Sequence, residues 1–353
     1  MTISHRRLWL QDIVVVIILA AAFCGVAPAS AQNEVTPLEK ALNVHPVAGP
    51  NRPANVPEGY VITPFGYFHP SCVQTLAKGD SQLQDGRIHH ANGATDENAL
   101  TCGFPRYTKN GTPVVVGSSK AAALKVTGKS APNQPVINDW VEDGAISTGS
   151  AKKSYGAILA EWTVPAQPTN PSDGQLLYFF PGFEDGYNTL SILQPVLRWY
   201  QGAWAIASWN CCINGVATNS DYVGVTSGDE IYGSVTSNCP AGTLSCPEWN
   251  VLTLDMSTGQ STTLGNTPSE EQAFGLAIGG TLEAYGVTSC DDYPSDGQIS
   301  FEKIVVFDQD LKPVAKPKWV DDIFESIYPY SPNTTPQCGY ALQSTKSKVT
   351  LVY

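Results

Sequence analysis

The sequence Phe179-Phe180-Pro181-Gly182-Phe183-Glu184-Asp185-Gly186, which continues to Ser191-Ile192-Leu193-Gln194-Pro195-Val196-Leu197, places two apolar runs on either side of a polar turn. Short apolar runs that are bounded by turn residues are typical of buried β-strands. The second run contains a single amide, Gln194. Because an unpaired buried polar group costs about 1–3 kcal/mol, this amide predicts either hydrogen-bond partners or a cavity.

The same pattern extends in both directions from these two strands. Short β-type runs separated by turn residues begin at Tyr155 and continue to Phe307, whereas helical periodicity is almost absent and is limited to residues 321–327. Strands at this spacing predict an all-β fold. We expect a two-sheet antiparallel β-sandwich of the jelly-roll, concanavalin-like type over residues 154–310, followed by a C-terminal extension over residues 311–353 that packs on the sandwich.

The N-terminus has the features of an export signal. Arg6 and Arg7 precede an apolar run over residues 13–22, and Ala29-Ser30-Ala31 follows. This order predicts a signal peptide over residues 1–31 that is cleaved after Ala31. An uncleaved anchor is the alternative, but the apolar run is shorter than the roughly 20 residues that a spanning helix needs. We therefore expect a secreted, extracellular protein with no membrane association after cleavage.

Residues 32–153 differ in composition from the predicted sandwich. Residues 32–60 are rich in Pro, Asn and Ala, and residues 118–153 are rich in Lys, Ser and Gly and end in Lys152-Lys153. Such compositions are typical of extended arms and linkers. We interpret residues 32–153 as an N-terminal segment and linker. The dibasic step at its end is either a protease site or part of an ordinary loop.

Eight cysteines follow the predicted signal peptide, which in an exported protein favours disulfides over thiol chemistry. Cys72–Cys102 and Cys239–Cys246 are plausible local pairs. The other four cysteines are the adjacent Cys211 and Cys212 and the distant Cys290 and Cys338. Their spacing leaves the pairing among them open.

Charge is distributed unevenly along the chain. Residues 32–153 contain 10 acidic and 11 basic residues, whereas residues 154–353 contain 21 acidic and 7 basic residues, a net charge of −14. Between Ser154 and Glu302 the only basic residue is Arg198. This balance argues against a nucleic-acid partner, which requires basic patches. It is consistent with adaptation to acid, where few cations repel one another, and equally with general solubility.

Histidine is confined to the N-terminal part of the chain. His5, His45, His69, His89 and His90 are the five histidines of the sequence. The predicted sandwich therefore has no histidine base, no Ser-His triad and no histidine metal site. The His89-His90 pair is the one place where a metal is conceivable, and a solvated loop is the alternative because no third ligand has a usual spacing. We expect no cofactor and no metal.

Gln194 and Glu283 are candidates for chemistry that needs no histidine. Strands that carry them could bring both side chains to one concave sheet face. A carboxylate with an ordinary pKa near 4.3 can activate a water in mild acid, and an amide N–H can stabilise an oxyanion. Together such groups can hydrolyse an amide. The alternative is that both are structural polar residues with satisfied hydrogen bonds.

Seven segments favour the catalytic interpretation because they occur together in a consistent order. They are Gly156-Ala157-Ile158-Leu159, Thr163-Val164-Pro165, Phe180-Pro181-Gly182-Phe183-Glu184-Asp185, Ser191-Ile192-Leu193-Gln194, Gly228-Asp229-Glu230-Ile231, Thr258-Gly259-Gln260 and Leu282-Glu283-Ala284-Tyr285. In this order they resemble the eqolisins, glutamic peptidases that fold as a β-sandwich and use a Gln–Glu pair. A more distant similarity is to the neprosins, which use a Glu–Glu pair.

The resemblance implies a secreted, acid-acting glutamic endopeptidase with polypeptide substrates, working as a monomer. Glu283 would be the general base and Gln194 the oxyanion donor. Substrate-binding residues would be Phe180, Glu184, Trp199, Trp209 and Tyr285. Residues 32–153 would be a propeptide that covers the acidic catalytic face of a zymogen. Pro195 departs from the family, which has Thr-Gly after its Gln, so we expect the strand to bend there.

Two other functions remain open from the sequence. If Trp199, Trp204, Trp209 and Trp249 are exposed, they could form a platform for sugar rings in a non-catalytic carbohydrate-binding sandwich. A glycosidase would pair Glu283 with Glu184 or Glu161, because such enzymes need two carboxylates roughly 5–9.5 Å apart. No closely spaced Glu-x-Asp-x-Glu motif supports the glycosidase.

Overall fold

A computed structural model describes residues 42–49, 52–109, 111–114, 137–185, 191–270, 273–321 and 338–353. The chain divides into two compact units, residues 1–36 and 37–353, and the described residues belong to the second unit. The predicted signal peptide and most of the helical segment expected at residues 321–327 lie outside the described residues. Among those that are described, no helix is long and apolar enough to cross a membrane.

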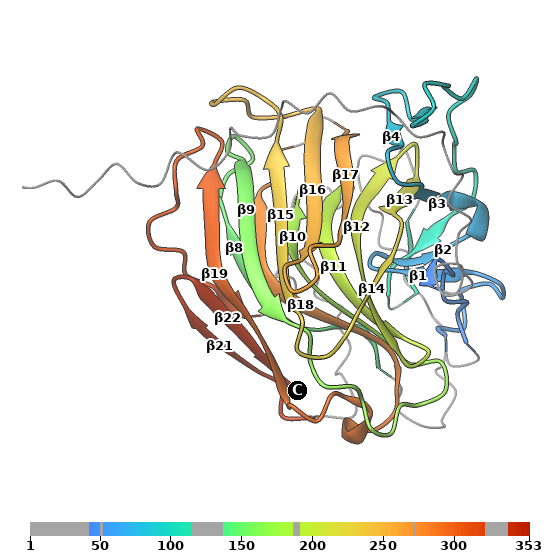
Figure 1. The fold of residues 1–353 in the computed structure, drawn as a ribbon, viewed down its shortest axis with the longest axis vertical. Coiled ribbons are helices and arrows are strands. Elements are labelled where there is room, and N and C mark those ends of the chain that lie inside the picture. The colour runs from blue at the N-terminus through green and yellow to red at the C-terminus, as the bar shows by residue number, and fades with distance from the viewer. Residues whose placement is uncertain are drawn as a thin grey trace, which may run out of the picture. The chain divides into compact units, whose positions relative to one another are not determined.

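The chain forms two large sheets packed face to face (Figure 1), which are antiparallel except where β3 pairs with β13 in parallel. The first has the order β20 (Val320–Asp321), β8 (Ile137–Ser147), β18 (Leu276–Val287), β10 (Leu176–Glu184), β11 (Ile192–Tyr200), β12 (Ala203–Ile213), β13 (Val216–Ser220) and β3 (Val73–Leu76), with β14 (Val223–Val225) paired to β12. The second has the order β17 (Ser261–Pro268), β16 (Glu248–Asp255), β15 (Glu230–Ser237), β9 (Tyr155–Thr163), β19 (Gln298–Asp308), β22 (Lys348–Val352) and β21 (Ala341–Thr345). The predicted all-β sandwich is confirmed.

The core between the two sheets follows from the alternation of side chains along each strand. On β10 and β11 the odd-numbered residues point into this core: Leu177, Phe179 and Phe183, and Leu193 and Leu197, are fully buried there. They pack against residues of the second sheet such as Ile158, Trp162, Ile231, Val251 and Phe301. The even-numbered residues of β10 and β11 must therefore point to the opposite face of the nine-stranded sheet.

That opposite face is covered by the N-terminal part of the described chain, residues 42–114, which we call the cover. It contains β1 (Val61–Thr63), β2 (Gly66–Phe68), the 3-10 turn η1 (Pro70–Cys72), β3, β4 (Ser81–Gln82), β5 (Ile88–His89), β6 (Arg106–Tyr107) and β7 (Pro113–Val114). Its buried residues form one apolar cluster with Tyr178, Phe180, Val196, Trp209 and Tyr285 of the large sheet. We call this side of the sheet the covered face.

Segments that composition assigned outside the sandwich supply strands to it, including β3 of the cover, which pairs with β13. Residues 137–147, which we interpreted as linker, form β8 and pair along their whole length with β18. Near the C-terminus, β22 pairs with β19 and β21 pairs with β22, so this extension completes the second sheet. The sandwich therefore starts before residue 154 and continues beyond residue 310.

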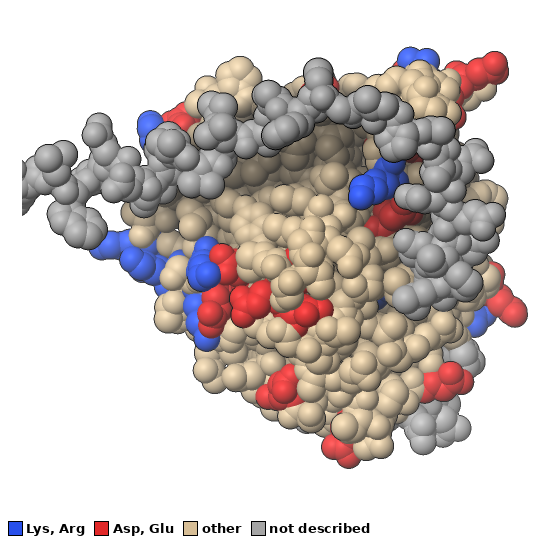
Figure 2. Space-filling view, viewed as in Figure 1, with Lys and Arg blue, Asp and Glu red and all other residues tan. Residues whose placement is uncertain are grey.

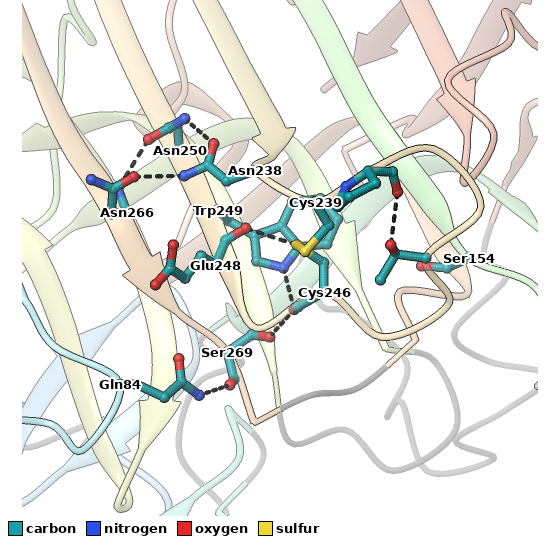
Figure 3. The surroundings of a disulfide bond; sticks show 12 residues. Gln84, Ser154, Asn238, Cys239, Cys246, Glu248, Trp249, Asn250, Asn266 and Ser269 are labelled. Carbon is teal, nitrogen blue, oxygen red and sulfur yellow. Dashed lines mark hydrogen bonds between the residues drawn. A yellow bond between two sulfur atoms is a disulfide. The ribbon is translucent and has the colours of Figure 1, made fainter.

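Four disulfides connect the eight cysteines. The local pairs Cys72–Cys102 and Cys239–Cys246 are as predicted, and the open pairing resolves to Cys211–Cys212 and Cys290–Cys338. Figure 3 shows the Cys239–Cys246 bond beside Ser269, whose backbone carbonyl accepts a hydrogen bond from Gln84 Nε2 at 3.0 Å. Gln84 belongs to the cover, so this contact joins the cover to the end of β17.

Most of the surface in Figure 2 carries neither sign of charge, and charged groups gather over β9 and β19. Lys303 Nζ lies 2.5 Å from Glu161 Oε2, and Lys348 Nζ lies 2.6 Å from Glu302 Oε1. These four side chains come from β9, β19 and β22 of the second sheet. Exposed pairs of this kind contribute about 1 kcal/mol or less, so the apolar core carries the stability of the fold.

Candidate active site

Gln194 is fully buried on the covered face, and neither atom of its carboxamide has a hydrogen-bond partner among the described residues. Trp209 lies opposite it on β12. On the other side is Gly182, where an added Cβ would come within 3.3 Å of Gln194 Cγ. A buried amide with both polar atoms unpaired costs stability, and the described residues of the cover leave its hydrogen-bonding capacity unused.

Pro195 does not bend β11. The strand runs from Ile192 to Tyr200 with continuous pairing to β12, from Ile192↔Cys211 to Tyr200↔Ala203. The expected bend after Gln194 was wrong. The reason lies on the neighbouring strand: the register Phe179↔Leu197 and Phe183↔Leu193 places Pro181 opposite Pro195. Each proline lacks the N–H that the other's carbonyl would accept, so the ladder opens there without leaving an unpaired donor.

Glu283 is fully buried on β18, on the same face. The hydroxyl of Tyr285, two residues along the strand, donates a hydrogen bond to Glu283 Oε1. Burial and, after it, the Glu283 charge raise the pKa of Tyr285 well above its ordinary value. Tyr285 therefore remains a protonated donor at any physiological pH and fixes the orientation of the carboxylate.

Gln194 and Glu283 share a face but are not adjacent. Strand β10 lies between their strands, and Glu283 pairs with Tyr178, whereas Gln194 lies level with Gly182. Two strand spacings and four residues of offset separate their Cα atoms by roughly 16 Å, from about 10 Å across and about 13 Å along the strands. The two side chains can act on one substrate bond only if that bond lies between them.

Glu184 is closer to Gln194 in the sheet. It pairs with Ile192, so it is a diagonal neighbour of Gln194 on the covered face, a relation that places Cα atoms about 7–8 Å apart. Its Oε2 has no hydrogen-bond partner among the described residues. Burial first, and the neighbouring Asp185 second, raise the pKa of Glu184 to about 8. Below that pH the Glu184 carboxyl is protonated and is available as a hydrogen-bond donor.

The aromatic candidates separate into two groups. Phe180, Trp209 and Tyr285 belong to the covered face, where they join the apolar cluster with the cover. Trp199 lies on the opposite face of β11 from Gln194, in the core between the sheets, 5.1 Å from Trp204 between ring centroids. The structure therefore does not bring Trp199 to the other candidates, because an odd residue number on β11 directs a side chain inward.

Three residues of the covered face were missed as site residues by sequence reasoning: Tyr178, Arg198 and Trp140. Tyr178 pairs with both Glu283 and Arg198 on the two flanking strands. Trp140 pairs with Glu283 from β8, and its ring contacts Phe180 at 5.7 Å. The alternation that places Gln194 on this face also selects Tyr178 and Arg198. Trp140 gave no such signal, since its strand was interpreted as linker.

The cover contacts these residues directly. The Tyr178 hydroxyl donates to the backbone carbonyl of Ile62 at 3.3 Å. Rings of the cover meet rings of the sheet: Tyr67 lies 5.6 Å from Tyr285, and Phe65 lies 6.4 Å from Trp209, between centroids. Gln194 and Glu283 are fully buried in the described chain. Both side chains are therefore closed off from solvent beneath the cover.

The other expected arrangements lack support. Trp199, Trp204, Trp209 and Trp249 are each at most 2% exposed, so the expectation of an exposed sugar platform is wrong. Glu161 lies on β9 of the second sheet, paired with Lys303, and does not share a face with Glu283.

No cluster of metal-binding residues occurs in the described parts of the chain. His90 is held between Asp80 and Asp96, at 3.0 and 2.9 Å.

Comparison with known proteins finds similarity among solved structures. No protein-family model and no curated protein matches the sequence. Scytalido-glutamic peptidase with a peptide-based transition state analog matches with 18% identity and a TM-score of 0.41, over 62% of this chain and 99% of that chain. SCP-B, a member of the eqolisin family of peptidases in complex with the tripeptide Ala-Ile-His, matches with 16% identity, a TM-score of 0.41 and the same coverage. Aspergilloglutamic peptidase from Aspergillus niger matches with 14% identity and a TM-score of 0.32, over 50% of this chain and 98% of that chain. The chemistry of the site therefore rests on this chain's own residues.

Proposed function

We propose that this chain is a secreted glutamic endopeptidase that hydrolyses polypeptides in acid, with Glu283 as general base and Gln194 as oxyanion donor. The observation that supports it most is the Gln194 carboxamide, which is fully buried and unpaired on the sheet face that also carries the fully buried Glu283. A carboxylate and an unpaired amide donor are the two groups that amide hydrolysis by an activated water requires. The more distant similarity to the neprosins stays a sequence-based expectation.

In the proposed reaction the Glu283 carboxylate removes a proton from a water, whose oxygen attacks the substrate carbonyl carbon. The carbonyl oxygen becomes an oxyanion and accepts a hydrogen bond from Gln194 Nε2. The carbon–nitrogen bond then breaks, and the leaving amine takes the proton from Glu283. Tyr285 positions the carboxylate through its hydrogen bond to Oε1. The scissile bond lies between Glu283 and Gln194, above Tyr178 and Phe180 of β10.

We further propose that the cover is a propeptide and that the chain is a zymogen. The cover closes the face on which substrate must bind, and it has a more basic composition than the sandwich. Because β8 is paired along β18, the cut that frees the cover falls between residues 114 and 137, where Lys120, Lys125 and Lys129 stand in the sequence. Lys152 and Lys153 lie exposed in the turn after β8. A cut there leaves the cover joined to a strand of the sheet.

The catalytic assignment is tested with Glu283→Gln and Gln194→Ala in the full chain after acid incubation. We expect the first to lose nearly all peptidase activity, and the second to lose about 10²–10³ in kcat, the usual effect of removing an oxyanion donor. Pepstatin should not inhibit the wild-type chain. Glu161→Gln, on the second sheet, is the matched control and should keep its activity. Wild-type activity in either site variant would falsify the assignment.

A further inference from the structure

Thr281 carries a hydroxyl on the covered face that forms no hydrogen bond within the described chain. The residue is fully buried, and its Oγ1 has no hydrogen-bond partner among the described residues. It lies on β18 opposite Phe180, which belongs to the covered face. A buried hydroxyl without a partner costs stability, and a valine of the same shape would pack there without that cost. Packing therefore does not explain the hydroxyl.

Thr281 lies between the levels of the two proposed catalytic residues. Glu283 is two residues farther along β18 on the same face, and residues at this spacing have Cα atoms roughly 7 Å apart. In the other direction, Gln194 lies level with Gly182 of β10, two residues beyond Phe180. The Thr281 hydroxyl is therefore next to the proposed base, on the side that faces the proposed oxyanion donor.

A β-bulge in β18 directly precedes Thr281. The register with β10 shifts between Phe180↔Thr281 and Gly182↔Ile278, so β18 has one extra residue there, within Gly279-Gly280. Bulges change the direction of neighbouring side chains and are common beside active sites. The bulge is thus a second feature, independent of the unused hydroxyl, that sets the position of Thr281 on this face.

A water that attacks a carbonyl needs a second contact besides its base. Ordered water in a protein makes about three hydrogen bonds, whereas a general base accepts only one of the two water hydrogens. A water that bridges two groups requires polar atoms about 5 Å apart, a separation that side chains two residues apart on a strand can reach. With one hydrogen on the Glu283 carboxylate and the other on Thr281 Oγ1, a lone pair of the water oxygen remains to face the substrate.

We propose that Thr281 holds the nucleophilic water: its hydroxyl oxygen accepts one hydrogen of the water while Glu283 removes the other, which directs the attack toward the carbonyl that Gln194 binds. The inference rests on the proposed peptidase function. No bond to Thr281 forms or breaks, and the proton that leaves the water passes to Glu283 alone. The bond that forms joins the water oxygen to the carbonyl carbon.

The test compares Thr281→Val, which keeps the shape and removes the hydroxyl, with Thr281→Ser, which keeps the hydroxyl. With the acid-incubated full chain and a fluorogenic peptide, we expect Thr281→Val to lower kcat about 10- to 100-fold and to leave KM within about twofold, because the water is misplaced while substrate binding is kept. Thr281→Ser should retain most of the wild-type kcat.

Thr218→Val is the matched control. Thr218 is also buried, and its Oγ1 also has no hydrogen-bond partner among the described residues. It lies on β13 opposite Asn210, whose Nδ2 donates to Thr267 Oγ1 of the second sheet at 2.7 Å, so Thr218 is on the face away from the site. Its kcat should equal that of the wild type.

Melting temperatures separate a catalytic hydroxyl from a structural one. Removing a buried hydroxyl that has no partner should leave the melting temperature of Thr281→Val at pH 7 equal to that of the wild type or higher, although its kcat falls. A lower melting temperature would assign the hydroxyl to the fold and overturn the proposal, as would a low kcat in Thr281→Ser. A wild-type kcat in Thr281→Val, with Glu283→Gln inactive, would overturn the role of Thr281 and leave the peptidase proposal standing. If the wild-type chain cleaves nothing, both proposals fail.

Discussion

Glu184 is a residue of the candidate site whose protonation affects stability. Burial and the neighbouring Asp185 raise the pKa of its carboxyl to about 8 in the folded chain, against an ordinary value of 4.5. A folded pKa above the unfolded one means that the folded chain holds the proton more tightly. The contribution of Glu184 to stability is therefore fully present below pH 4.5, and is lost as the pH rises through 8.

Replacing Glu184 by Gln removes this dependence on pH. We expect Glu184→Gln to be as stable as the wild type at pH 4 and more stable at pH 7.5, by roughly 4 kcal/mol, because at pH 7.5 the unfolded wild type ionises this carboxyl freely whereas the folded chain keeps most of it protonated. Melting temperatures at the two pH values measure the effect, with the exposed Glu248→Gln as control. If the melting temperatures of Glu184→Gln and the wild type differ by the same amount at both pH values, Glu184 is not protonated in the folded chain.

For single residues, the sequence predicted the candidates Gln194 and Glu283 but not the side chains that surround them. Gln194 was recognisable because an amide stands out in an apolar strand, and alternation gave its face. The distance from Gln194 to Glu283 depends on the register of β10 with both flanking strands, which no local pattern encodes. Trp199 was misplaced because its size suggested a binding surface, whereas its odd position directs it into the core.

At the scale of elements, the approach of β10 to β11 beside Gln194 depends on Gly182. An added Cβ there would clash with the Leu193 carbonyl and press on Gln194 Cγ. Pro181 and Pro195 face each other at the neighbouring position, so no ladder hydrogen bond joins the two strands at that point. Only a residue without a side chain permits this contact.

Gly182→Ala should force the strands apart and displace Gln194. We expect a loss of about 1–3 kcal/mol in stability, as for other overpacked sites, and a fall of about 10- to 100-fold in kcat/KM, because the oxyanion donor moves. Gly265→Ala, on β17 of the second sheet, is the matched control. An added Cβ at Gly265 meets only Asn250 Oδ1, at 3.9 Å. If Gly182→Ala retains full activity, Gln194 does not act from this position.

The number of strands was underestimated from composition at both ends of the sandwich. Strand β8 has the sequence Ile137-Asn138-Asp139-Trp140-Val141-Glu142-Asp143-Gly144, whose acids and glycine favour a loop by local propensity. Pairing with β18 along its length overrides that preference. The C-terminal strands β21 and β22 were likewise not predicted as parts of the sandwich, because a long stretch of sequence separates β22 from its partner β19, and β21 joins the sheet through β22.

For the whole molecule, the main question is what releases the cover. His45 of the cover contacts Trp209, and its Nε2 lies 3.2 Å from Thr75 Oγ1. Burial first, and the charge of Arg198 second, lower the pKa of His45 to about 4 from an ordinary 6.5. A lowered folded pKa means that docking of the cover is fully stabilised above pH 6.5, and that this stabilisation is lost as the pH falls through 4.

At pH 5 the protonation of His45 alone favours the uncovered chain by roughly thirtyfold. His45→Gln, which keeps a hydrogen-bonding group for Thr75 but does not titrate, should therefore release the cover at a lower pH than the wild type. Limited proteolysis of the cover as a function of pH measures the midpoint. His89→Gln is the control, because the His89 side chain is exposed. Identical midpoints for His45→Gln and wild type would exclude His45 as the acid-sensitive group.

Casein hydrolysis by the full-length chain across pH 2–7, with and without prior acid incubation, tests the proposed peptidase and the role of its cover together. The chain should hydrolyse casein in acid after incubation, and the unincubated chain should not hydrolyse it at pH 7, because the cover closes the face that carries Gln194 and Glu283. Absence of hydrolysis at every pH would contradict the peptidase assignment, and full activity at pH 7 without incubation would contradict the role of the cover.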